Sequence, residues 1–272
     1  MLNTQQLMDQ AVLLAGLKEM PEDCGIMVHG ENIKKVLFGV DMDTPELLLA
    51  KELGYDCVVS HHPRNTNKDI LNVLNDHVKK LAELGVPVNK SQKLLAKQKG
   101  SLGYNGHVSN SRRSESAAQL LNMPFMCIHT PTDLIGEAIV QKHLDEKFAN
   151  KPETTLKEIC DAIEEISEYK NSERKPVIRV GSGESYAGKI YVLMSGLTGP
   201  GADILKEYFE AGVGTLVMMH IPEADAKIIT EQNIGNVIIA GHMSSDSLGI
   251  NKLAEKWAES GVETTVMSGI VK

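Results

Sequence analysis

Short apolar runs alternate with amphipathic stretches through most of this chain. The clearest example starts with residues 35–41 (KVLFGVD), continues with a helix start at 43–46 (DTPE) and ends with residues 57–60 (CVVS). Pro45 suits the first turn of that helix. A strand, a helix and a second strand in this order predict parallel strands joined by a right-handed crossover. The same alternation resumes after residue 176, so the sequence predicts an α/β fold with mainly parallel sheets.

The remaining periodic segments predict further elements of both kinds. Helices are expected over 4–17, 70–84, 90–99, 114–121, 135–149, 155–166, 202–211, 223–232 and 246–260. Strands are expected over 85–88, 124–129, 189–195, 214–219, 236–240 and 263–268. Residues 100–106 are expected to form a glycine-rich loop and 170–175 a polar linker.

Composition excludes several classes of protein. The 272 residues are 42% hydrophobic and 24% charged, which is ordinary for a globular chain of one large or two average domains. A net charge of −8 argues against a nucleic-acid binder with a broad basic face. The sequence has neither a signal-peptide pattern nor an apolar run of the roughly 20 residues that cross a bilayer. Because Cys24, Cys57, Cys127 and Cys160 form no C-x-x-C pair, we expect reduced thiols and a cytoplasmic protein.

Histidines and carboxylates follow three of the predicted strands. His61 and His62 end the first of these runs, and Pro63 stops the strand from continuing. The second strand end reads HTPTD (129–133) and the third reads GHMSSD (241–246). Ligands of open α/β sheets bind at the carboxyl ends of the strands, and histidine is the commonest metal ligand in proteins.

Each of these strand ends also has a purely structural explanation. A histidine pair occurs in ordinary surface loops, His129 and Asp133 fit a capped loop, and Asp246 fits a helix-start carboxylate. Together, however, the histidines and the two carboxylates are a sensible ligand set for one or two divalent ions such as Zn²⁺, Mn²⁺, Fe²⁺ or Ni²⁺. Bridging carboxylates of this kind are typical of two-metal hydrolytic sites.

These motifs resemble those of the GTP cyclohydrolase 1 type 2 homologues, also called the Nif-three-like dinuclear metal centre proteins. That family carries S-H-H-P, then H-T-N-L-D, then G-H-x-x-S-E. Here Ser60-His-His-Pro63 matches the first motif without change. The segment 129–133 matches the second at its His, Thr and Asp, and 241–246 matches the third with Asp246 in place of Glu. The resemblance runs from about Val36 to the C-terminus.

The resemblance implies a fold, a site and an assembly. It implies two interleaved α/β domains, one of residues 1–135 completed by 236–272 and one inserted over 136–235, with a ligand cleft between them. It implies a homo-oligomer, a hexamer by analogy. It also implies two divalent metal ions per chain and, beside them, His129 as an acid/base group. The implied metal ligands are His61, His62, Asp133, His242 and Asp246.

Two departures from the family pattern affect the site. Asp246 shortens the bridging arm by one methylene group. The segment 90–122 is longer than the family pattern predicts, and His107 within it is a candidate additional ligand.

The leading functional hypothesis is a metal-dependent hydrolase. A metal-bridging water would attack a nucleotide-like substrate, a phosphoester or a cyclic amide. A D-H-H phosphoesterase also uses adjacent histidines, but Ser60 stands where that class has Asp. The alternative is a non-catalytic metal-binding protein with a regulatory or metal-handling role. A third reading, in which the histidines bind nothing, also stays open.

Residues outside these motifs offer weaker candidates. His220 and Glu223 follow a predicted strand and either line the same cleft or are exposed polar residues. Arg112 and Arg113 either hold a substrate phosphate or belong to a solvated helix start. Residues 183–189 have P-loop spacing, but Ile190 replaces the metal-binding hydroxyl residue and a strand follows, so we reject that reading.

Overall fold

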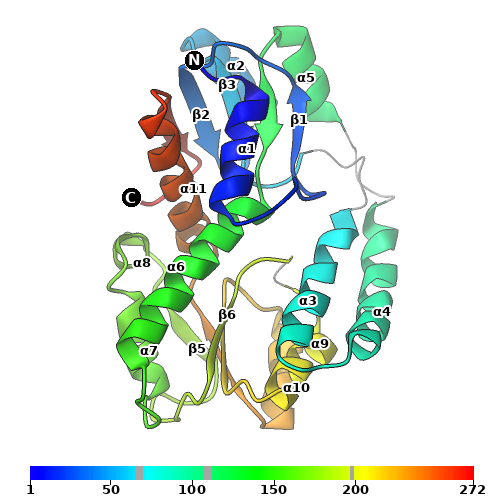
Figure 1. The fold of residues 1–272 in the computed structure, drawn as a ribbon, viewed down its shortest axis with the longest axis vertical. Coiled ribbons are helices and arrows are strands. Elements are labelled where there is room, and N and C mark those ends of the chain that lie inside the picture. The colour runs from blue at the N-terminus through cyan, green and yellow to red at the C-terminus, as the bar shows by residue number, and fades with distance from the viewer. Residues whose placement is uncertain (65–69, 107–111, 197–198) are drawn as a thin grey trace. The chain divides into compact units, whose positions relative to one another are not determined.

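The computed structural model describes residues 1–64, 70–106, 112–196 and 199–272. The chain forms two compact units, each assembled from separate segments (Figure 1). The first unit comprises Met1–Ile70, Val108–Ile135 and Asp246–Lys272, and the second comprises Leu71–His107 and Gly136–Ser245. Compared with the domains expected from the sequence, residues 71–107 cluster with the second unit. The first unit resumes at Asp246 instead of residue 236.

The first unit is built on a five-stranded sheet. The strands, in spatial order, are β1 (Gly25–Val28), β4 (Phe125–Cys127), β3 (Cys57–Ser60), β2 (Lys35–Gly39) and β9 (Glu263–Met267). Only β1 is antiparallel to its neighbour β4. The parallel pairing of β2 with β3 confirms the strand–helix–strand unit predicted from the sequence.

Helices cover both faces of this sheet. They are α1 (Thr4–Leu14), α2 (Thr44–Glu52), α5 (Arg113–Leu121) and α11 (His242–Glu259), the last of which enters from the second unit. Successive β2 residues point to opposite faces, as the pleat of a strand requires. Leu37 shares an apolar cluster with α2 and α5. Phe38 stacks on Trp257 of α11 with ring centroids 5.7 Å apart, and the Trp257 indole donates to the Leu7 carbonyl of α1.

The second unit is built on a four-stranded sheet. The strands, in spatial order, are β5 (Val177–Val180), β8 (Asn236–Ile239), β7 (Thr215–Met218) and β6 (Ile190–Leu193), with only β5 antiparallel to its neighbour. A 3-10 turn, η1 (Ile70–Leu74), leads into its first helix. Its helices are α3 (Asn75–Glu83), α4 (Val88–Gly106), α6 (Thr130–Phe148), α7 (Leu156–Ile163), α8 (Ser167–Asn171), α9 (Ala202–Glu210) and α10 (Glu223–Gln232). The N-terminal turn of α6 belongs to the first unit.

Packing explains why residues 71–107 join the second unit. Leu81 of α3, Leu95 of α4 and Tyr208 of α9 are buried in one apolar cluster. A buried ion pair adds to this contact, with Lys80 Nζ 2.7 Å from Glu137 Oε1 on α6. The two helices therefore bury their apolar faces against α9.

Three sequence predictions were wrong or incomplete. Residues 85–88 are not a strand: Val86 is buried, and α4 begins at Val88, directly after Pro87. Residues 100–106 are not a loop but the last turns of α4, because packing of this helix against the core outweighs the low helix propensity of glycine. The two antiparallel strands, β1 and β5, were not predicted.

Two further expectations concern the membrane and the thiols. In the part of the chain that the structure describes, no helix combines the length and the apolar character of a transmembrane span. No disulfide joins any of the four cysteines.

Candidate metal centre

The histidine pair lies at the carboxyl end of β3, where the sheet hydrogen bonds continue one step past the strand. The amides of His61 and His62 donate to the carbonyls of Gly39 and Val40, each at 2.9 Å. Ser60 fixes the corner, since its hydroxyl donates to the His62 carbonyl at 3.0 Å and accepts from the Met42 amide at 3.2 Å. The serine of the S-H-H-P motif thus holds the backbone that presents both imidazoles.

His129 and Asp133 lie at the carboxyl end of the neighbouring strand, β4. His129 directly precedes α6, and Asp133 is in the first turn of that helix. Residues four apart lie on one face of a helix, and His129 Nε2 is 3.7 Å from Asp133 Oδ2. The second motif therefore presents an imidazole and a carboxylate on the same side.

Asp246 reaches the centre because two helices approach backbone to backbone. A Cβ atom on Gly249 of α11 would lie 2.0 Å from the Thr132 carbonyl oxygen in the first turn of α6. Only glycine permits that separation. Asp246 lies one turn before Gly249 and is 1% exposed, so the close approach brings its carboxylate to the end of β3.

The Nε2 atoms of three histidines converge on two buried carboxylates. His61 Nε2 lies 3.4 Å from Asp133 Oδ1 and 3.5 Å from Asp246 Oδ1. His62 Nε2 lies 3.8 Å from Asp246 Oδ2. The rings of His61 and His129 are 4.8 Å apart between centroids. These side chains form one compact cluster within the first unit.

The opposite ring nitrogen of each histidine is held by an outer partner. His61 Nδ1 lies 2.9 Å from Thr132 Oγ1, and His62 Nδ1 lies 3.1 Å from Asp41 Oδ1. His129 Nδ1 lies 2.7 Å from Asp23 Oδ2. Metal-binding histidines usually donate their second ring N–H to a carboxylate, a carbonyl or a similar acceptor, which leaves the other nitrogen free to bind the ion. All three rings are oriented in this way, with Nε2 facing the carboxylates.

The cluster passes a direct test of fit to a cation. His61 Nε2 is buried and makes no hydrogen bond to any described residue. A buried polar atom left in this state costs roughly 1–3 kcal/mol, and a cation would satisfy it. Ligand atoms of His61, Asp133 and Asp246 lie within 4.8 Å of one another, as do those of the three histidines. These groups could therefore hold a metal ion.

Burial and charge set the protonation of the histidines. Burial, together with the charge of His61, lowers the pKa of His62, which favours the neutral imidazole that binds metals. Burial also acts to lower the pKa of His129, but the carboxylates of Asp133 and Asp23 outweigh it and raise that pKa above its ordinary value. His129 is thus more inclined to carry a proton than His62.

Within the first unit, the structure brings together five of the residues predicted from the sequence. His61, His62, His129, Asp133 and Asp246 are clustered in the first unit. His242 is the first residue of α11, one turn before Asp246, and belongs to the second unit. There its ring packs against His220 with centroids 4.9 Å apart. His107 lies outside the described residues.

Sequence reasoning missed the residues that orient the cluster. Asp41 could have been recognised, because it stands at the end of the apolar run that contains β2. Asp23 could not have been recognised in this way, since it precedes β1, a strand that the sequence did not predict. Besides His129, Asp23 accepts hydrogen bonds from the amide and the hydroxyl of Thr130.

Comparison with known structures identifies the family of this chain. A solved NIF3 superfamily protein from Sphaerobacter thermophilus is 32% identical to this chain, covers 98% of both chains and has a TM-score of 0.92. The chain belongs to the NIF3 superfamily. The resemblance inferred from the S-H-H-P motif is therefore confirmed.

More distant structures share the fold of this NIF3 superfamily chain. Reduced HcgD from Methanocaldococcus jannaschii is 15% identical, with 98% of this chain and 99% of that one covered and a TM-score of 0.59. TTHA1606 from Thermus thermophilus is 15% identical, with 98% of both chains covered and a TM-score of 0.58. No protein-family model and no curated protein matches the sequence.

Proposed function

We propose that this chain is a metal-dependent hydrolase with two divalent ions per chain. The ligands are His61, His62, Asp133, His242 and Asp246. The observation that carries the proposal is the buried His61 Nε2 atom, which makes no hydrogen bond to a described residue and faces two buried carboxylates. His242 joins the set because it lies one turn before Asp246, on the same helical face.

The chemistry divides between the ions and the protein. Two divalent ions at such a site acidify water at neutral pH and so supply a nucleophile. His129 moves the proton, since its Nε2 faces Asp133 and its Nδ1 is held by Asp23. Its raised pKa suits it to donate a proton to a leaving group near neutral pH. The substrate class is a nucleotide-like molecule, a phosphoester or a cyclic amide.

Metal analysis tests the ligand set. After loading with Zn²⁺, Mn²⁺, Fe²⁺ or Ni²⁺, elemental analysis is expected to find about two ions per chain, as in two-metal sites. His61→Ala and Asp246→Asn should each lose most of the metal. The matched control is His143→Ala on α6, because His143 donates to the Ala162 carbonyl far from this motif in the sequence. Equal metal content in the wild type and the three variants would contradict the proposed ligand set.

Turnover is tested separately on loaded protein. A panel of phosphoesters and cyclic amides should include a substrate that the wild type hydrolyses and that His129→Gln hydrolyses at least about 100-fold more slowly, the low end of general acid–base contributions. Metal content should be unchanged in His129→Gln. Full metal occupancy with no hydrolysis across the panel would instead favour a non-catalytic metal-binding protein.

We also propose that the protein is a homo-oligomer, with the hexamer as the expected state. Support comes from the family resemblance. Light scattering coupled to size exclusion is expected to give six times the chain mass of 29.7 kDa. A monomeric mass would contradict it.

A further inference from the structure

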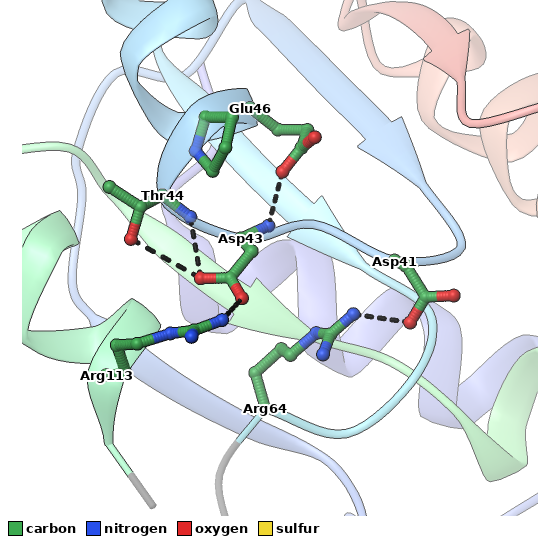
Figure 2. Close-up of a pocket in the computed structure, with 7 residues that line it drawn as sticks. Asp41, Asp43, Thr44, Glu46, Arg64 and Arg113 are labelled. Atoms are coloured by element: carbon green, nitrogen blue, oxygen red, sulfur yellow. Dashed lines mark hydrogen bonds and ion pairs between the residues drawn. The ribbon is translucent and has the colours of Figure 1, made fainter. Parts of the chain in front are cut away.

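A pocket of about 480 Å³ lies in the first unit near the candidate metal centre. Its volume falls within the range of small-molecule sites. Segments from three parts of the chain line it, namely the turn after β2 with the start of α2, the residue that follows Pro63, and the start of α5 (Figure 2). The lining residues are Asp41, Asp43, Thr44, Pro45, Glu46, Arg64 and Arg113.

Two arginines reach this pocket from different segments. Figure 2 shows Arg113 extending toward Asp43, and Arg64 toward Asp41. Each guanidinium forms an ion pair with that carboxylate through one Nη atom. A guanidinium has five N–H donors in a fixed plane, so most of each fork remains for another acceptor. Arg64 Nε is buried and makes no hydrogen bond to any described residue.

Two of the lining carboxylates are committed to the first turn of α2. Asp43 accepts from the Thr44 amide at 2.7 Å and from the Ser114 hydroxyl at 2.8 Å. Glu46 accepts from the Asp43 amide at 2.7 Å, which completes a capping box. Both oxygens of Asp43 are thereby engaged, and this carboxylate holds the helix start and Arg113 in place.

Asp41 joins the pocket to the candidate metal centre. The same carboxylate oxygen that pairs with Arg64 lies 3.1 Å from His62 Nδ1. One side chain therefore separates Arg64 from a histidine of the cluster. The three lining carboxylates outnumber the two guanidiniums, so the field of divalent ions nearby would strengthen the binding of an anion.

We propose that Arg64 and Arg113 bind an oxyanion group, a phosphate or a carboxylate, of the small molecule on which the metal centre acts. The inference rests on the proposed function, and it deepens it by naming the group that positions the substrate. Paired guanidiniums match both oxyanions through parallel N–H···O hydrogen bonds. The neighbouring Arg112 is not part of the pocket, because its Nε and Nη2 donate to Glu115 at 3.0 and 2.8 Å.

Calorimetric titration of metal-loaded protein with inorganic phosphate, and separately with acetate, tests the proposal. The variants are Arg64→Gln and Arg113→Gln, with Arg112→Gln as the matched control on the adjacent residue. At least one of the two anions should bind the wild type, and each pocket variant should weaken it about tenfold or more, as expected for lost hydrogen bonds to a charged group. Arg112→Gln should bind like the wild type. The tighter of the two anions identifies the oxyanion.

Several outcomes separate this proposal from the metal proposal. Metal content and melting temperature are measured for every variant, so a loss of metal or of fold is recognised. If the wild type holds no metal, the proposed function fails. In that case the anion affinities of the wild type and of the arginine variants, measured on the same metal-free protein, still test whether Arg64 and Arg113 bind an oxyanion. Equal anion affinity in all four proteins, or no binding of either anion, would overturn the inference.

Discussion

At the scale of single residues, the candidate metal centre depends on what lies behind its histidines. Thr132, Asp41 and Asp23 each take the Nδ1 side of one ring and leave Nε2 facing Asp133 and Asp246. Free imidazoles rotate and exchange tautomers, whereas a hydrogen-bonding partner behind each of these three rings holds it in one orientation. Such preorganisation lowers the conformational cost of binding.

Asp23 provides the clearest test of this arrangement. In Asp23→Asn the charge that helps to raise the pKa of His129 is removed, so that pKa should fall in metal-free protein. Loaded protein should retain its metal, while turnover of the best panel substrate drops about 10- to 100-fold, as is typical for groups behind metal-site histidines. Titration of the histidine ring protons by NMR measures the first effect and steady-state kinetics the second.

The exposed Asp9 on α1 supplies the control for this substitution. Asp9→Asn should leave both the His129 titration and the turnover unchanged. An unaltered His129 pKa in Asp23→Asn would show that Asp23 does not set the protonation of that ring.

Sequence analysis could identify the residues of the site that stand in a recognisable pattern. His61, His62, His129, Asp133 and Asp246 stand at the ends of predicted strands, where position alone suggests a role. Asp23 and Gly249 do not, because their importance lies in contacts with residues more than 100 positions away. Only the fold reveals such contacts.

At the scale of elements, the start of α2 combines a cap with the wall of the pocket. Asp43 accepts from Thr44, Ser114 and Arg113, and these hydrogen bonds lower its pKa to about 2 against the opposing effect of burial. Loss of an N-cap typically costs about 1 kcal/mol. Asp43→Ala should therefore lower the free energy of unfolding by about that amount or somewhat more, because bonds to α5 are lost as well.

The same carboxylate predicts a pH dependence. Its pKa is lower in the folded chain than the ordinary 3.8, so its contribution is fully present above pH 4 and is lost as the pH falls toward 2. Urea denaturation of wild type and Asp43→Ala between pH 7 and pH 2.5 should show the difference shrinking with acid. The control is Asp161→Asn, an exposed partner of Lys157. A difference that stays constant with pH would contradict this role.

Two helical glycines should respond in opposite ways to alanine. In Gly249→Ala the new methyl group meets the Thr132 carbonyl, so α11 must move away from α6. The result should be a loss of about 1–3 kcal/mol of stability, as for other overpacked positions, together with weaker metal binding. Gly100 in α4 is exposed with nothing near its Cβ position, so Gly100→Ala should stabilise by up to about 1 kcal/mol.

Thermal melts and metal titration of both glycine variants measure these effects. A Gly249→Ala protein as stable as the wild type, with unchanged metal affinity, would show that the helices tolerate a wider separation.

Most elements could be predicted from periodicity, and the misses share one cause. Strands β3, β4 and β7 are buried along their whole length, as is typical of parallel strands with both faces covered. The antiparallel β1 and β5 are partly exposed and lack that pattern. The glycines of α4 suggested a loop, yet the helix continues because its leucines are packed in the core.

At the scale of the molecule, the chain passes repeatedly between its two units. The second unit is complete by Ser245, whereas the first needs Asp246–Lys272 to supply β9 and most of α11. A chain ending at residue 245 should keep the second unit folded and lose the first. The reason is that Phe38 loses Trp257 and β2 loses the pairing with β9.

Hydrogen exchange measures this outcome strand by strand. Amides of β7 and β8 should remain protected in the shortened chain, while those of β2 and β3 exchange as in an unfolded chain. The full chain is the control. Protection retained in β2 would show that the first unit does not depend on its C-terminal segment.

The shared position of Asp41 has a thermodynamic consequence. One carboxylate serves both His62 and Arg64, so an anion that engages Arg64 alters how strongly Asp41 holds the His62 ring. Binding free energies coupled through a common group are reciprocal. Whatever factor the anion adds to the affinity of the metal, the metal must add to the affinity of the anion, and the protein would then respond to the two together instead of to either one alone.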